Sequence, residues 1–79
     1  MYSANHIETY NQIISDLTSD NQTEIADFLA NAITGAFSGT ETCAMMIAAL
    51  RNIQNSNVIS NEITKKINDL IVDINAKLR

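Results

Sequence analysis

The chain has 79 residues, of which 46% are hydrophobic and 18% charged, and its net charge is −4. This composition is too apolar for a disordered protein and predicts one folded domain over residues 1–79. A single cysteine excludes an internal disulfide, and no apolar run approaches the roughly 18 residues that span a bilayer. The first residues lack the basic cluster and apolar run of a secretory signal. We therefore expect a cytoplasmic protein, unless it is exported without a cleavable signal.

The turn residues predict the fold class. With no proline and two glycines, the chain has few of the turn-forming residues that connect the short strands of a sheet. We therefore predict an all-α fold, a small bundle of three to four helices. Because so short a chain hides about 60% of its unfolded surface when it folds alone, we expect oligomerisation to complete the bundle.

The first predicted helix covers residues 3–17, with Ser3 as its N-cap. The segment 18–21, Thr-Ser-Asp-Asn, favours helix caps over helix interiors and predicts a break. The second predicted helix covers residues 21–34 and ends before Gly35, where a left-handed residue costs least without a Cβ. Its predicted buried side chains are Ile25, Phe28, Leu29, Ala32 and Ile33.

The third predicted helix covers residues 41–54, with Thr40 as its N-cap. Small and flexible apolar side chains cover most of its circumference, which predicts a central helix contacted from several sides. The last predicted helix covers residues 60–79, with Ser60 as its cap.

The last helix has the clearest pattern in the chain. Its large apolar residues repeat at intervals of three and four, which places them in one stripe that the helix cannot bury by itself. We expect the exposed part of this stripe, with isoleucines of the first helix, to form a self-association surface. Its residues are Ile13, Ile14, Ile63, Ile67, Leu70, Ile74 and Leu78.

Charge divides the chain into an acidic front and a mildly basic back. Residues 1–50 contain six carboxylates and no lysine or arginine, whereas residues 51–79 contain all five basic side chains. An acidic surface attracts basic partners. The acidic residues that we expect to form such a surface are Asp16, Asp20, Glu24 and Asp27.

The sequence offers no convincing catalytic or metal site. His6 and Cys43 are the single histidine and cysteine, and we expect a surface histidine and a buried thiol rather than a catalytic pair. The acidic residues lack the glycine of a calcium loop, and no Gly-Lys-Ser/Thr follows Gly35 or Gly39. We predict a non-enzymatic protein with no cofactor and no bound metal. With Arg51 as the one basic residue of its third helix, direct binding to nucleic acid is not expected.

Short matches along the chain resemble the bacterial biofilm and acid-resistance regulators described as AriR-like two-component-system connector proteins. They are Ile7 with Tyr10, the segment from Ile25 to Gly35, Phe37-Ser38, Cys43-Ala44, the Met46-Ile47-Leu50 triplet and the last helix around Ile67, Leu70 and Ile71. This resemblance implies an all-helical homodimer that acts by binding regulatory proteins.

A second resemblance is to type III secretion needle subunits. It rests on chain length, the loop from Phe37 to Thr40 and the C-terminal pattern from Lys65 to Arg79, although the proline-bracketed turn of those subunits is replaced here by Phe-Ser-Gly-Thr. Because that turn is missing, the first resemblance is preferred, and we expect a dimeric regulator that works by protein–protein interaction. The alternatives are a filament subunit, or an acidic inhibitor or immunity-type protein that binds a basic partner.

Overall fold

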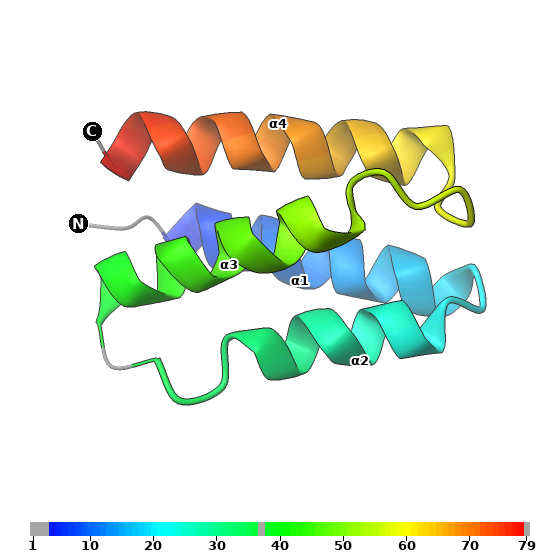
Figure 1. The fold of residues 1–79 in the computed structure, drawn as a ribbon, viewed down its shortest axis with the longest axis horizontal. Coiled ribbons are helices and arrows are strands. Elements are labelled where there is room, and N and C mark those ends of the chain that lie inside the picture. The colour runs from blue at the N-terminus through cyan, green and yellow to red at the C-terminus, as the bar shows by residue number, and fades with distance from the viewer. Residues whose placement is uncertain (1–3, 37, 79) are drawn as a thin grey trace.

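The computed structural model describes the backbone of residues 4–36 and 38–78, and it is entirely helical in its regular structure. The helices are α1 (Ala4–Ser19), α2 (Thr23–Ala32), α3 (Gly39–Ile53) and α4 (Asn61–Leu78), as Figure 1 shows. The prediction of a small all-α bundle is confirmed.

The helices run alternately up and down, and each packs against two others. The pairs in contact are α1 with α2, α2 with α3, α3 with α4, and α4 with α1. Figure 1 shows that the α1–α2 turn and the α3–α4 loop lie at one end of the bundle. The start of α1, the α2–α3 loop and the end of α4 lie at the other end.

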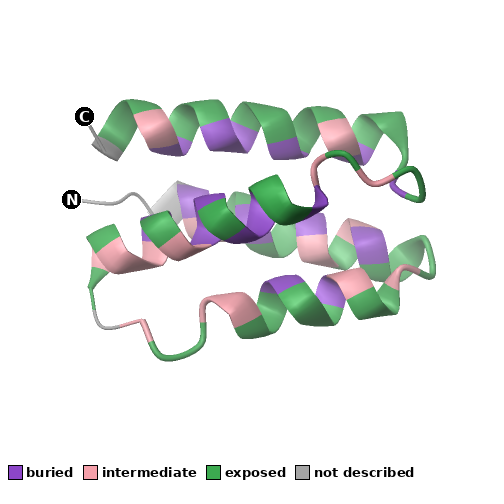
Figure 2. Cartoon of the chain, viewed as in Figure 1, coloured by how far each residue is buried: buried purple, intermediate pink, exposed green. Residues whose placement is uncertain are grey.

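A single apolar core runs through the centre of this arrangement, and Figure 2 shows that each helix carries both buried and exposed residues. Every helix contributes, so the four amphipathic stripes cover one another within one chain. The largest fully buried side chains are Tyr10, Ile13, Leu17, Leu29, Met46, Leu50, Ile67, Leu70 and Ile74, together with Cys43.

The predicted break between the first two helices is present, but it lies later in the chain. α1 continues through Ser19, and the Thr18 hydroxyl donates to the Ile14 carbonyl at 3.0 Å instead of capping a new helix. Asn21 then takes a left-handed φ of 64°, which asparagine tolerates better than most residues. α2 begins at Thr23, two residues after its predicted start.

α2 ends at Ala32, earlier than its predicted end, and Gly35 follows with a φ of 90° as its position predicted. The Tyr10 hydroxyl donates to the Leu29 carbonyl at 2.6 Å. The N–H of Ile33, which would bond to that carbonyl in a longer α-helix, points to the Asn31 carbonyl instead. The last turn of α2 is thus joined to a side chain of α1.

The caps of the last two helices are serines. Ser38 caps α3, where its Oγ accepts from the Glu41 N–H at 3.0 Å, so the prediction of Thr40 as the cap was wrong. Ser60 caps α4 as predicted, and its Oγ accepts from the Ile63 N–H at 3.3 Å. The predicted cap Ser3 lies outside the described residues.

α3 is not a central helix, although its composition predicted one. It packs against α2 and α4 as each other helix packs against two neighbours, and Ala44 and Ala48 on its outer side are exposed. Small side chains leave little apolar area on this outer face, so the bundle tolerates their exposure.

Candidate functional site

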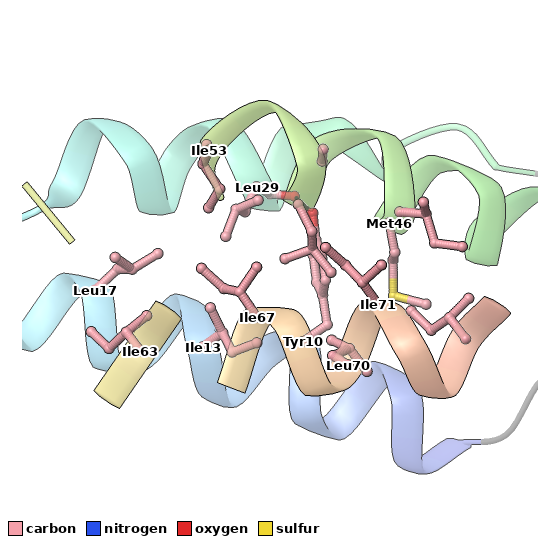
Figure 3. Close-up of a cluster of buried hydrophobic side chains, with 14 of the residues drawn as sticks. Tyr10, Ile13, Leu17, Leu29, Met46, Ile53, Ile63, Ile67, Leu70 and Ile71 are labelled. Atoms are coloured by element: carbon pink, nitrogen blue, oxygen red, sulfur yellow. Dashed lines mark hydrogen bonds between the residues drawn. The ribbon is translucent and has the colours of Figure 1, made fainter. Parts of the chain in front are cut away.

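The stripe predicted for self-association forms the interior of a single chain. Ile63, Ile67, Leu70 and Ile74 of α4 are each at most 4% exposed, and they pack with Ile13 of α1, which is fully buried. Figure 3 shows Ile63, Ile67 and Leu70 among the buried side chains of the cluster. This prediction must be corrected for these five residues, because α1, α2 and α3 of the same chain already cover the stripe.

Two residues of that prediction stand apart from the core. Ile14 is partly buried against the core cluster, and the side chain of Leu78 lies outside what the structure describes. Among the side chains that the structure describes, the large apolar ones that are exposed to solvent are instead Phe28 of α2, Val58 of the α3–α4 loop and Val72 of α4, at 42%, 58% and 66% exposure. Phe28 was predicted to be buried, so that prediction was wrong.

The exposure of Phe28 follows from the geometry of α2. Ala26 and Leu29 point to the core, and Phe28 is one residue before Leu29, which rotates it by about 100° around the helix. This rotation places the ring at the edge of the buried face. The sequence contained this signal, because a helix that buries Ala26 and Leu29 together cannot also centre Phe28 on the core.

The four predicted acidic residues do not form one uniform surface. Asp16 accepts from Lys66 Nζ at 2.6 Å and from Gln12 Nε2 at 3.1 Å, which ties α1 to α4. The hydrogen bond from Lys66, with that from Gln12, lowers the pKa of Asp16. The negative charge of Asp16 is therefore paired with a lysine of the same chain.

Asp20, Glu24 and Asp27 remain exposed. Among the described residues, no lysine or arginine nitrogen lies within 4.0 Å of these three carboxylates. We call these three residues, together with Phe28, the acidic face. It runs from the α1–α2 turn along the outer side of α2 and places an aromatic ring beside uncompensated negative charge.

Two hollows lie at the end of the bundle that holds the α1–α2 turn and the α3–α4 loop. One, of about 170 Å³, surrounds the Asp16–Lys66 ion pair and is lined also by Ser19, Asp20, Ser60, Glu62 and Ile63. The other, of about 400 Å³, lies between residues 21–25 and Val58. We call the second hollow the end groove; it has both apolar and polar walls.

The two candidate reactive side chains are both buried. His6 is 6% exposed, so the prediction of a surface histidine was wrong, and its Nδ1 has no hydrogen-bond partner among the described residues. Cys43 is 1% exposed as predicted, and burial raises the pKa of its thiol. A raised thiol pKa favours the protonated form, which is a poor nucleophile.

Clusters of metal ligands and membrane-spanning helices are both absent from the part of the chain that the structure describes. No three histidine, cysteine, aspartate or glutamate side chains gather there in a way that could hold a metal ion. Within the same residues, none of the four helices combines the length and the apolarity that a membrane crossing requires.

Comparison with family models, with curated proteins and with solved structures finds no match to this chain. The resemblances to connector proteins and to needle subunits therefore stay predictions from sequence.

Proposed function

We propose that this chain is a non-enzymatic protein-interaction module that binds a basic partner protein through its acidic face. The observation behind the proposal is the exposure of Phe28 directly beside Asp27 and one turn after Glu24. Aromatic side chains are enriched in protein-binding sites, and the rims of such sites are polar. On α2, the Phe28 ring can therefore act as an apolar anchor for a partner, and Glu24 and Asp27 can attract its positive charges.

The charge distribution supports a basic partner. Residues 1–50 contain no lysine or arginine, so nothing in the first two helices offsets Asp20, Glu24 and Asp27. Charges of one sign on a surface speed the approach of an oppositely charged protein and disfavour partners of the same sign. The acidic inhibitor or regulator is thus the form of the interaction module that this surface favours.

Self-association has less support than the sequence suggested. The described part of the stripe on α4 is buried within the chain, and among the described side chains of this helix the exposed large apolar one is Val72. Val72 lies between Asp69 and Asp73, so two copies meeting through this face would bring their carboxylates together. The dimeric regulator and the filament subunit remain proposals that rest on resemblance.

The experiment compares two neutralised variants. One carries Asp20→Asn, Glu24→Gln and Asp27→Asn on the acidic face, and the matched control carries Glu62→Gln, Asp69→Asn and Asp73→Asn on α4, so that both variants lose three negative charges. Each is titrated with an acetylated, amidated oligolysine peptide over a series of salt concentrations. We expect the wild type and the control to bind with a steep salt dependence, and the acidic-face variant to lose most of the binding.

The same proteins are examined by sedimentation over a wide concentration range. The proposal predicts a monomer throughout. Equal binding of oligolysine by both variants would overturn the proposal, and a discrete dimer or growing polymers would return the argument to a connector protein or a filament subunit.

A further inference from the structure

The end groove adjoins the acidic face and differs from it in having a built apolar wall. Its lining residues are Asn21, Gln22, Thr23, Glu24, Ile25 and Val58. Ile25 is partly buried against the core, whereas Val58 projects from the α3–α4 loop with 58% of its surface exposed. A space of about 400 Å³ between two branched side chains is large enough for an apolar side chain of another molecule.

The groove also contains backbone donors. Gln22 occupies the N-cap position of α2 and makes no side-chain cap hydrogen bond, unlike the serines that cap α3 and α4. The first N–H groups of a helix have no acceptor within the helix, so they are available to an acceptor that enters the groove. The Asn21 backbone, with its φ of 64°, brings the chain sharply around to form this edge of the groove.

The carboxylates at the end groove determine which kind of molecule can bind there. Glu24 is part of the lining, and Asp20, which lines the neighbouring hollow, is adjacent in sequence to the lining residue Asn21, so negative charge lies in and beside the groove. A free anion would suit the helix N-terminus but would meet these carboxylates, whereas a peptide carbonyl is a neutral acceptor. Lysine or arginine side chains on the same peptide would approach Asp20 and Glu24 at the distances where opposite charges attract.

From these three features we infer that the end groove binds an extended segment of the basic partner in which one apolar side chain is flanked by lysine or arginine. The inference rests on the proposed function and names the part of the partner that is recognised. The apolar side chain inserts between Ile25 and Val58, a main-chain carbonyl accepts from the start of α2, and the flanking cations pair with Asp20 and Glu24. The acidic face supplies attraction, and the groove supplies selectivity for the apolar residue.

The test uses the intact chain labelled with ¹⁵N and two short acetylated, amidated peptides. The first has a leucine between lysines, and the second has serine in place of the leucine and the same charge. We expect the leucine peptide to bind more tightly and to shift the amide resonances of residues 21–25 and of Val58. The serine peptide should shift chiefly the residues around Asp20, Glu24 and Asp27.

Two exposed valines provide a matched pair of variants. Val58→Ser removes one wall of the groove, whereas Val72→Ser makes the same chemical change on the outer face of α4; both residues are exposed, so neither change disturbs the core. We expect Val58→Ser to weaken binding of the leucine peptide by roughly fivefold, because part of one apolar contact is lost. Val72→Ser should leave it unchanged.

Each outcome has a separate meaning. If the leucine and serine peptides bind equally, or if both valine variants behave alike, the groove inference is overturned while the basic-partner proposal stands. If neither peptide nor oligolysine binds even at low salt, the proposed function itself fails. Selective loss with Val58→Ser, together with preference for leucine, supports both.

Discussion

The Tyr10 hydroxyl of α1 and the Leu29 carbonyl of α2 are joined by a hydrogen bond of 2.6 Å between two fully buried residues (Figure 3). The bond does two things at once. It satisfies a buried phenol and it joins α1 to the last turn of α2. The contact between these two helices is therefore fixed by a polar bond as well as by apolar packing.

Tyr10→Phe keeps the ring and removes the hydroxyl, which leaves the Leu29 carbonyl without this donor. We expect the free energy of unfolding to fall by about 1 to 3 kcal/mol, the usual cost of a buried polar group that loses its partner. Urea unfolding followed by circular dichroism measures this change. An unchanged midpoint would show that the hydrogen bond is not needed for the fold.

The same residue predicts a loss of stability in alkali. Burial raises the pKa of Tyr10 above its ordinary value of about 10, because the charged phenolate is poorly solvated in the core. The unfolded chain ionises first, so the contribution of Tyr10 is complete below pH ~10 and declines as the pH rises further. Unfolding measured against pH should show this decline in the wild type, and Tyr10→Phe should flatten it.

The Asp16–Lys66 pair predicts an effect at the acidic end. Since Lys66 is the main cause of the lowered pKa of Asp16, Lys66→Met should raise that pKa toward its ordinary value, with Gln12 still holding it partly down. Lys65→Met is the control on the adjacent exposed position. Carboxyl resonances followed against pH give the measurement.

The sign of the linked stability is fixed by the direction of the shift. A carboxylate with a lowered pKa stabilises the fold above its unfolded-state pKa of about 3.9, and this contribution disappears as the pH falls through the folded-state value. Lys66→Met should therefore reduce the acid sensitivity that belongs to Asp16. Equal titration of Asp16 in both lysine variants would contradict the role of the pair.

Two alanine substitutions distinguish whether Ser38 or Thr40 caps α3. Ser38→Ala removes the acceptor for the Glu41 N–H and should cost about 1 kcal/mol of stability. Thr40→Ala changes an exposed side chain inside the first turn and should cost much less. A larger loss with Thr40→Ala in thermal unfolding would restore the cap predicted from the sequence.

A charge placed on α4 tests whether the apolar stripe is interior or interface. Ile67→Asp puts a carboxylate at a fully buried position and should unfold the chain, because nothing nearby is placed to compensate a charge in the core. Val72→Asp, on the outer face, should leave the fold intact. Circular dichroism with sedimentation distinguishes unfolding from dissociation; a folded monomer produced by Ile67→Asp from a larger species would restore the interface interpretation.

The helical content was predictable because the apolar spacing of residues such as Ile63, Ile67 and Leu70 has a single periodicity. The same spacing does not say which surface covers the stripe. A second copy of the chain could cover the stripe, and so could the other three helices of the same chain. Which of the two occurs depends on how tightly the connections between helices fold the chain back on itself. This is why the bundle was predicted and its closure within one chain was not.

Capping and pairing were harder to predict for a related reason. Ser38 and Thr40 both have a hydroxyl suited to a helix start, and the choice between them depends on the path of the loop before α3. Likewise Asp16 resembles Asp20 in sequence, but Lys66, 50 residues away in the chain, reaches only the former. Long-range geometry, rather than residue type, separates the acidic residues that are free from the one that is paired.

The up-and-down course of the helices leaves the start of α1 and the end of α4 together at one end of the bundle, while the end groove lies at the opposite end. An affinity tag, a fluorescent label or a neighbouring domain joined at either terminus would thus be held a full helix length from the groove. The chain can be tethered to a surface or to a larger protein by its ends and still present the end groove to solvent.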